Sequence, residues 1–280
     1  MSTYIYTSGL RMINWSVNLS MLFMEIPFLY RFQAAADAGF RAVEFHWPSN
    51  VDIDSLVYAK QASGVEVALL NIDAGDIYQG DRGFASHPER KSWWRARAET
   101  AMRLARRLNA KRINALAGIE VQDYSIETMR DCLCDNLTWA IPKAESLGIS
   151  LMLEPLNRYE FPGYLITRTS EAIEIIDKLG SSSVQLQFDF YHTQRNEGNL
   201  IDLLRSHVEA IGHIQIADSP DRNQPGTGDI NWLRVLNELE TVGYAGFVGL
   251  EYTPVPNTIE SLRWLPRPMR EQCRADQLTF

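Results

Sequence analysis

The stretch "LMLEPLNRYEFPGY", residues 151–164, places Glu154 directly after a short aliphatic run. Such a run, followed by a proline, is typical of a buried parallel strand that ends at the glutamate. Three later runs, "VQLQFD" (184–189), "GHIQI" (212–216) and "FVGLE" (247–251), also bring a polar residue to the end of an apolar segment. The fold must therefore explain why carboxylates and an amide gather where buried strands end.

Short apolar runs alternate with longer amphipathic segments along the chain, and this pattern is typical of parallel strands joined by crossover helices. Eight such pairs without an interrupting linker favour an α/β fold that is a closed (β/α)8 TIM barrel over an open doubly wound sheet. We expect a single domain over residues 1–280, with its core at about 14–265 and a C-terminal tail at about 266–280. The expected strands span residues 14–18, 42–45, 66–71, 112–116, 150–154, 184–189, 210–216 and 247–251.

The composition is that of a globular protein, since 45% of the 280 residues are hydrophobic and 22% are charged. The net charge of −8 repels polyanions, so no nucleic-acid partner is expected. The most basic stretch, residues 95–112, has apolar residues at helical spacing and is interpreted as an amphipathic helix with a solvated basic face. The stretch "GTGDIN" (226–231) is too short for a dinucleotide fingerprint and lacks the Lys-Ser/Thr of a phosphate-binding loop, so no nucleotide cofactor is expected.

The cysteines and the N-terminus bear on the cellular compartment. Cys132, Cys134 and Cys273 form neither a disulfide framework nor a zinc-finger pattern, which favours a reducing compartment. The first residues lack the basic start and uninterrupted apolar segment of a secretory signal. No stretch approaches about 18 consecutive apolar residues, the length of a membrane-spanning helix. We therefore expect a cytoplasmic protein without a membrane partner.

Side-chain alternation predicts which residues of the later strands point into the barrel, because successive side chains of a strand face opposite sides. If the aliphatic residues face the helices, the inward residues at the C-terminal strand ends are Glu154, Asp189, Gln215 and Glu251. Catalytic residues of TIM barrels lie at this end of the strands. Each acid could instead only terminate its strand or cap the next helix, but matching alternation on four successive strands favours a shared site.

Three carboxylates and an amide in a small volume repel one another unless a cation is bound or some acids are protonated. A divalent metal is the simpler solution, and hard oxygen ligands suit Mg²⁺ or Mn²⁺ better than a soft-ligand zinc site. A metal beside two carboxylates suggests chemistry at a carbon next to a carbonyl. One carboxylate removes a carbon-bound proton, an enediolate forms, and the other returns a proton to the neighbouring carbon. Glu154 and Glu251 fit this pair of roles, and the sequence leaves open which one starts.

Three residues near these strand ends are candidates for substrate binding. His192 follows the sixth strand and could hydrogen-bond a substrate oxygen, although a lone loop histidine is as often structural. Arg222 lies in the loop after the seventh strand, where a guanidinium could bind a carboxylate through two parallel hydrogen bonds, although an isolated surface arginine is usually only solvated. Glu160 is expected either to turn back over the mouth of the barrel or to be a solvent-facing loop acid.

Several stretches together resemble the hydroxypyruvate isomerase family within the xylose isomerase-like TIM barrel superfamily. They are "VNLSMLFMEIPFLYRFQAAADAGFRAVEFHWP" (17–48), "LMLEPLNRYEFPGYLITRT" (151–169), "QFDFYHTQRNEGNL" (187–200), "HIQIADSPDRNQPGTGDINW" (213–232) and "GFVGLEYTP" (246–254). The resemblance extends over about residues 17–264. Gln215 and the amino-terminal "NLSMLF" favour the isomerase branch, because sugar epimerases and endonuclease IV usually have histidine at the position of Gln215.

The resemblance implies roles for seven residues. It assigns the catalytic acid/base pair to Glu154 and Glu251. The metal-site positions that it implies are Glu154, Asp189, Gln215 and Glu251. Similarity to the epimerases implies substrate contacts for His192, Arg222 and Glu160.

The family interconverts hydroxypyruvate and 2-hydroxy-3-oxopropanoate (tartronate semialdehyde), which are related by a proton transfer through an enediolate. The resemblance therefore predicts an isomerase that acts on a small hydroxy or oxo acid, and it suggests a homo-oligomer. A divalent metal, Mg²⁺ or Mn²⁺, is implied, although members of the family are often described without an obligatory one.

Other functions stay open at this point. His46, Trp47 and "SHPERKSWW" (86–94) differ from the typical isomerase at the barrel mouth and could fit a longer acid, such as a 2-oxo-tetronate. A ketose 3-epimerase of the same superfamily is the second enzymatic alternative. An enzyme like endonuclease IV would need a histidine-rich multi-metal cluster and a DNA-binding surface, which five histidines and a net charge of −8 disfavour. The non-enzymatic alternative is a sugar-acid binding protein, against which the intact glutamate pair argues.

Overall fold

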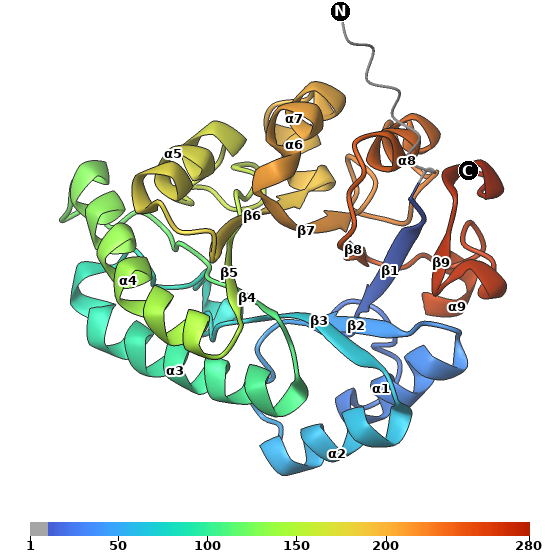
Figure 1. The fold of residues 1–280 in the computed structure, drawn as a ribbon, viewed down its shortest axis with the longest axis horizontal. Helices are drawn as coiled ribbons and strands as arrows, with labels where there is room; N and C mark the ends of the chain where they lie inside the picture. Colours follow the sequence, from blue (N-terminus) through green and yellow to red (C-terminus); the bar gives the residue numbers. More distant parts are fainter. Residues whose placement is uncertain (1–10) are drawn as a thin grey trace, which may run out of the picture.

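Eight parallel strands form a closed barrel, so the predicted TIM-barrel fold is confirmed (Figure 1). The structure is a computed structural model, and it describes residues 11–280. Neighbouring strands follow the chain order from β2 to β8, and β1 pairs with both β8 and β2, which closes the barrel. The barrel strands are β1 (Ile13–Asn18), β2 (Ala42–Phe45), β3 (Glu66–Asn71), β4 (Arg112–Asn114), β5 (Ser150–Leu153), β6 (Val184–Asp189), β7 (Ile211–Ile216) and β8 (Phe247–Leu250).

Helices surround the barrel and cover the outward faces of its strands (Figure 1). The α-helices are α1 (Phe28–Asp37), α2 (Ile53–Ser63), α3 (Lys91–Leu108), α4 (Ile126–Ser146), α5 (Thr169–Leu179), α6 (Phe190–Asn196), α7 (Leu200–His207), α8 (Trp232–Thr241) and α9 (Thr258–Ser261). Short 3-10 turns are η1 (Ile77–Gln79), η2 (Pro88–Arg90), η3 (Val208–Ala210), η4 (Arg267–Met269) and η5 (Ala275–Gln277). None of the helices within residues 11–280 is both long enough and apolar enough to cross a membrane.

The period of two along each strand separates an apolar outer layer from a polar interior. Leu151 and Leu153 of β5 belong to one hydrophobic core, which also contains the buried faces of α3 and α4. Between them, Met152 is buried but lies outside that core, because it points into the barrel, where its side chain approaches Gly212 of β7. The same alternation directs the carboxylates at the strand ends inward.

The observed strands match the expected ones except at their ends. β4 stops at Asn114, two residues earlier than expected, while β5 and β8 stop one residue before Glu154 and Glu251. Strand bounds follow the last ladder hydrogen bonds and shift by one or two residues for that reason. The two glutamates therefore lie just beyond the sheet, at the carboxyl end of the barrel.

Residues 266–280 lie beside the first strand. A short strand, β9 (Gln272–Cys273), pairs antiparallel with β1. Trp15 donates a hydrogen bond from Nε1 to Cys273 Sγ over 3.3 Å, and the rings of Trp264 and Phe280 stack with centroids 5.5 Å apart. These contacts attach the end of the chain to the barrel.

Candidate active site

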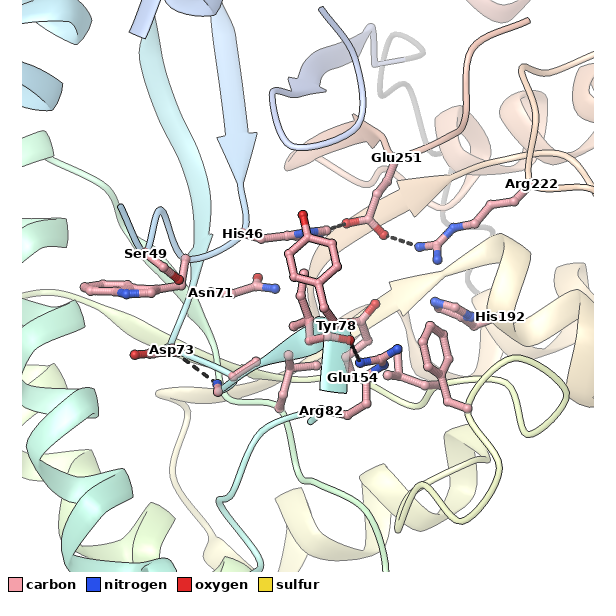
Figure 2. Close-up of a pocket in the computed structure, with 17 residues that line it drawn as sticks. His46, Ser49, Asn71, Asp73, Tyr78, Arg82, Glu154, His192, Arg222 and Glu251 are labelled. Carbon is pink, nitrogen blue, oxygen red and sulfur yellow. Dashed lines mark hydrogen bonds and ion pairs between the residues drawn. The ribbon is translucent and has the colours of Figure 1, made fainter. Parts of the chain in front are cut away.

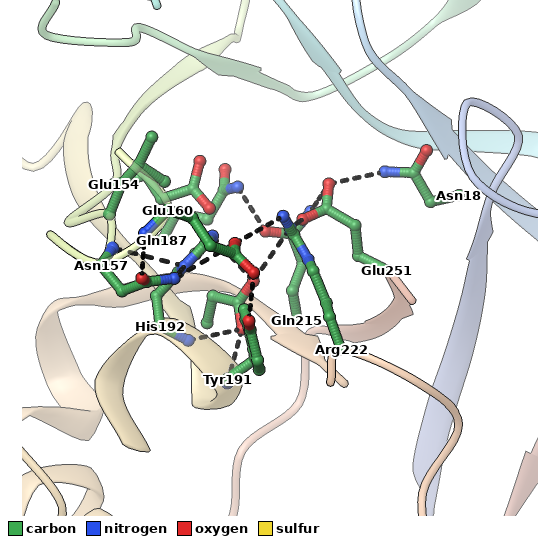
Figure 3. A network of polar contacts seen from close by, with 12 residues as sticks. Asn18, Glu154, Asn157, Glu160, Gln187, Tyr191, His192, Gln215, Arg222 and Glu251 are labelled. Atoms are coloured by element: carbon green, nitrogen blue, oxygen red, sulfur yellow. Dashed lines mark hydrogen bonds and ion pairs between the residues drawn. The ribbon is translucent and has the colours of Figure 1, made fainter. Parts of the chain in front are cut away.

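The ends of β5, β6 and β8 bring three carboxylates together inside the barrel. Glu154 and Glu251 directly follow their strands, and Asp189 is the last residue of β6. His192, in the first turn of α6, joins them. One ligand atom from each of these four buried residues lies within 4.8 Å of the others. We call these four residues the carboxylate cluster; Figure 3 labels Glu154, His192 and Glu251 of this cluster together with polar residues around them.

Glu251 contacts four polar groups. Its Oε1 accepts hydrogen bonds from Asn18 Nδ2 at 2.8 Å and from Gln215 Nε2 at 3.0 Å, and lies 3.0 Å from His46 Nε2. Its Oε2 accepts a hydrogen bond from Arg222 Nη2 at 2.6 Å. Burial alone would raise the pKa of Glu251, but the hydrogen bond with His46 and the charge of Arg222 outweigh burial and lower this pKa to about 2. Glu251 is therefore ionised at neutral pH.

Glu154 has a much poorer set of partners. Asn114 Nδ2 donates a hydrogen bond to Glu154 Oε2 at 2.6 Å, and no other side chain within residues 11–280 does so. Burial, followed by the negative charges of Glu251 and Asp189, raises the pKa of Glu154 well above its ordinary value. Two carboxylic acids at one site thus differ in protonation, since Glu154 keeps its proton to a much higher pH than Glu251.

Asp189 has one bonded and one unbonded oxygen. Its Oδ1 caps α6 by accepting hydrogen bonds from the backbone N–H groups of Tyr191 at 2.7 Å and His192 at 3.4 Å. Its Oδ2 is buried without a hydrogen-bond partner in the described part of the chain, 3.7 Å from His192 Nε2 and 3.9 Å from Arg222 Nη2. Burial raises the pKa of Asp189 to about 7 and, together with Arg222, lowers the pKa of His192 well below its ordinary value. An unpaired oxygen and a neutral imidazole therefore face the cluster.

Arg222 links the carboxylate cluster to the loop after β5. Its Nη1 lies 3.7 Å from Glu160 Oε2, and its guanidinium lies over the Tyr191 ring, 5.3 Å from the centroid. Glu160 accepts hydrogen bonds from the Tyr191 hydroxyl and from Asn157 Nδ2. Asn157 Nδ2 also lies 2.8 Å from His192 Nδ1, which turns His192 Nε2 toward the cluster. All seven residues singled out in the sequence therefore lie in or beside one polar network, and Figure 3 labels all of them except Asp189.

A cavity of about 320 Å³ is lined by four of these seven residues, whereas Asp189, Gln215 and Glu160 do not line it. Glu154, His192, Arg222 and Glu251 line it at the strand ends, and His46 and Trp47 line it after β2. The loop between β3 and α3 lines it from another side, where Figure 2 shows Tyr78 and Arg82. The loop residues at the cavity are Asp73, Ala74, Gly75, Ile77, Tyr78 and Arg82.

The sequence matches the family model described as "Xylose isomerase-like TIM barrel" over residues 32–267. The chain belongs to the xylose isomerase-like TIM barrel family. Within this family, "Hydroxypyruvate isomerase" of Escherichia coli (strain K12) is 41% identical over 254 residues, which span 91% of this chain and 98% of that protein. The resemblance seen in the sequence is thereby confirmed.

Two other similar proteins have different names. "2-oxo-tetronate isomerase" of Cupriavidus necator is 36% identical over 91% of this chain and 98% of that protein. The solved structure of "AP endonuclease, family 2 from Brucella melitensis" superposes with a TM-score of 0.89 at 34% identity, over 92% of this chain and 100% of that one. This xylose isomerase-like barrel therefore matches its relatives over almost their whole length.

A polar layer beneath the carboxylate cluster of this xylose isomerase-like barrel was not predicted. Glu44 Oε2 accepts a hydrogen bond from Ser16 Oγ at 2.7 Å and lies 2.8 Å from His213 Nε2, while Oε1 accepts one from Gln215 Nε2 at 2.8 Å. Gly249 approaches Glu44 so closely that a Cβ atom there would overlap the carboxylate. Gln215 thus bridges Glu44 to Glu251 and supports the cluster from below.

The same alternation rule would have identified this layer. Applied to β1 and β2, it directs Ser16, Asn18, Glu44 and, one step beyond the strand, His46 into the barrel. In β4, Asn114 is likewise the inward residue that meets Glu154. The partners of the two glutamates were therefore readable from strand parity, but the pairing of each donor with its acceptor was not.

The carboxylate cluster of this xylose isomerase-like barrel fits a divalent cation. Its donor set is three carboxylates and one imidazole, and the unpaired Asp189 Oδ2 is an oxygen that a cation would satisfy. Gln215 directs Nε2 at Glu251, while its Oε1 accepts from Gln187. The oxygen and the nitrogen of an amide have nearly the same shape, so either orientation of the Gln215 side chain fits the same space. Whether Gln215 directs its oxygen at a cation therefore stays a prediction.

Proposed function

We propose that the protein is an isomerase that interconverts hydroxypyruvate and 2-hydroxy-3-oxopropanoate. The observation that supports this most is the pair Glu154 and Glu251, two buried carboxyl groups at one cavity whose pKa values move in opposite directions. The reaction needs one group that accepts a proton from carbon and another that supplies one. The name of the 41% identical Escherichia coli relative supports the substrate class.

The proton transfer follows from these two charge states. Glu251, which is ionised, removes a proton from C3 of hydroxypyruvate, and the electron pair of the C–H bond forms the double bond of an enediolate. Glu154, which holds its proton, delivers it to C2. The C3 hydroxyl loses its proton as the aldehyde forms, and the C2 oxygen takes one up. Exchange with water then restores both glutamates.

The neighbouring groups bind the substrate oxygens. Arg222 places positive charge beside Glu251 and Asp189, where it stabilises the negative charge of the enediolate. His192 presents Nε2 to the same space and contacts a substrate oxygen. Glu160 lies 3.7 Å from Arg222 Nη1 and helps to hold Arg222 in place, and the resemblance to the epimerases supports a contact of Glu160 with a substrate hydroxyl.

We further propose that Mg²⁺ or Mn²⁺ binds at Glu154, Asp189, His192 and Glu251, with Gln215 as the further predicted position; the charge states given above are those of the site without a cation. When bound, the cation polarises the substrate carbonyl and stabilises negative charge on oxygen. The three cysteines are free, which supports the predicted cytoplasmic location. A homo-oligomer stays a prediction from the resemblance.

Proton NMR in D₂O tests this function. Purified protein is incubated separately with hydroxypyruvate, a 2-oxo-tetronate and a ketohexose, each with and without Mg²⁺ or Mn²⁺. Deuterium incorporation and interconversion with hydroxypyruvate are expected, and the two metal conditions show whether the cation is required. The 36% identical Cupriavidus necator relative makes 2-oxo-tetronate isomerisation the second candidate, and turnover of that acid alone would establish it. Turnover of the ketohexose alone would indicate an epimerase, and no exchange in any tube would indicate a binding protein.

A further inference from the structure

Two arginines line the cavity, and their surroundings differ. Arg222 has three carboxylate neighbours: its guanidinium nitrogens lie 2.6 Å from Glu251, 3.7 Å from Glu160 and 3.9 Å from Asp189. These acids already balance its charge. A substrate carboxylate bound at Arg222 would compete with Glu251 for the same guanidinium nitrogen.

Arg82, in the loop between β3 and α3, has no acidic partner within residues 11–280. Its Nη1 donates hydrogen bonds to the backbone carbonyls of Ile77 at 2.9 Å and Asp81 at 2.6 Å. Its guanidinium lies over the Phe161 ring, 5.0 Å from the centroid. These contacts fix the group in position and leave Nε and Nη2 without an acceptor in the described chain. Figure 2 shows it among the residues that line the cavity.

Arg82 is connected to the carboxylate cluster through an aromatic ring. Phe161 contacts His192 edge to face, with centroids 5.7 Å apart, so Arg82, Phe161 and His192 form a continuous row along the cavity. Asp73 belongs to the same loop and also lines the cavity, but it does not neutralise the charge of Arg82. Its Oδ2 lies 3.6 Å from Arg97, and its Oδ1 accepts a hydrogen bond from the backbone N–H of Gly75.

We propose that Arg82 binds the carboxylate of the substrate and makes the site selective for 2-oxo acids over neutral ketoses. A fixed guanidinium whose Nε and Nη2 have no acceptor within residues 11–280 offers the planar pair of donors that a carboxylate accepts. In three- and four-carbon 2-oxo acids alike, the carboxylate is attached to C2, one of the two carbons between which the proton moves. An anion site in the cavity that the cluster also lines therefore suits both acids. This inference rests on the proposed isomerase function and names its substrate class.

Two variants of matched chemistry test the proposal. Arg82→Gln removes the charge at the cavity. Arg90→Gln removes an arginine that stacks on Phe84 in the same connection between β3 and α3, but that is exposed and does not line the cavity. Calorimetry measures the binding of glycerate, a non-reacting hydroxy acid, and of glycerol, its neutral analogue. Hydroxypyruvate kinetics give KM and kcat for the same proteins.

Arg82→Gln is expected to weaken glycerate binding and to raise KM by about 100-fold, the loss typical of a charged hydrogen-bonded pair. Arg82→Lys is expected to recover part of this loss, and Arg90→Gln to match the unaltered protein. Glycerate affinity within threefold of the unaltered protein in Arg82→Gln would overturn the proposal. So would a fall in kcat alone with unchanged glycerate affinity, since that result would mark a purely structural role in the loop. Because glycerate binding needs no turnover, lack of activity in the unaltered protein would count against the isomerase function and leave the test of Arg82 intact.

Discussion

The two sides of the active site hold the same chemical group in different surroundings. On the side formed by β7, β8, β1 and β2, Glu251 contacts four polar groups that include the Arg222 guanidinium. On the side formed by β4, β5 and β6, Glu154 accepts a hydrogen bond from Asn114 and lies near Asp189, whose Oδ2 has no hydrogen-bond partner within residues 11–280. Both glutamates are 4% exposed, so burial does not distinguish them.

The comparison teaches that partners, rather than depth, set the charge of a buried carboxyl group here. Burial raises the pKa of both groups, and only Glu251 has enough donors and positive charge to reverse that effect. In the proposed mechanism, one side of the barrel thus supplies the base and the other supplies the acid. Substitutions that make the surroundings of Glu154 and Glu251 more alike should therefore change the rate of proton transfer while the barrel stays folded.

Removing either carboxylate should have the largest effect. Glu154→Gln and Glu251→Gln keep the size of the side chain but remove the group that gains or loses the proton, so each should lower kcat by at least about 10³-fold. Deuterium exchange into hydroxypyruvate measures the loss, and circular dichroism should show an unchanged fold. Near-normal turnover in either variant would contradict the two-carboxylate mechanism.

Removing a partner of Glu251 should make the two sides more alike. His46→Phe removes the group 3.0 Å from Glu251 Oε1, so the pKa of Glu251 should rise and kcat/KM should fall by about 10- to 100-fold. The acid limb of the kcat/KM profile should move to higher pH. His46→Gln keeps a donor and serves as the control, with a smaller shift. Identical pH profiles for His46→Phe and the unaltered protein would show that His46 does not set the charge of Glu251.

A change at Glu44, which lies below the cluster, tests whether its hydrogen bonds stabilise the side of the barrel that holds Glu251. Glu44→Gln puts an amide N–H₂ among the donors Ser16, His213 and Gln215, and should cost about 2–4 kcal/mol of stability. Calorimetry should show Tm lower by roughly 5–10 °C. Glu66→Gln, at the exposed start of β3, is the control and should leave Tm nearly unchanged. Equal Tm values for both variants would mean that the Glu44 network adds no stability.

The pH dependence of stability should show the smallest effect. Asp189 and Glu154 have raised pKa values in the folded chain, so folding takes up protons and stability falls as the pH rises, for Asp189 between about pH 4 and pH 7. Glu251 acts in the opposite direction, because its lowered pKa contributes stability that is lost only as the pH falls from 4.5 toward 2. With EDTA present, Tm should therefore decline between pH 5 and pH 7, and the decline should be weaker in Asp189→Asn. A Tm that rises over this interval in the unaltered protein would contradict the raised pKa values.

The sequence by itself determined the barrel and the inward direction of its polar strand ends. Alternation is a local property, because each side chain points opposite to its neighbour whatever the rest of the chain does. It therefore placed Glu154, Asp189, Gln215 and Glu251 in the barrel interior, and it would have placed Glu44 there as well.

Only the tertiary structure decided the charges and the free arginine. Asn18 and Glu251 are hydrogen-bonded although 233 positions separate them in the chain, and no local pattern reports such a pairing. Within residues 11–280, Arg82 has no acidic partner, because its guanidinium contacts the backbone carbonyls of Ile77 and Asp81 and the Phe161 ring instead. A pKa depends on every charge and dipole within a few ångströms, and the closure of the barrel is what brings those groups within that range.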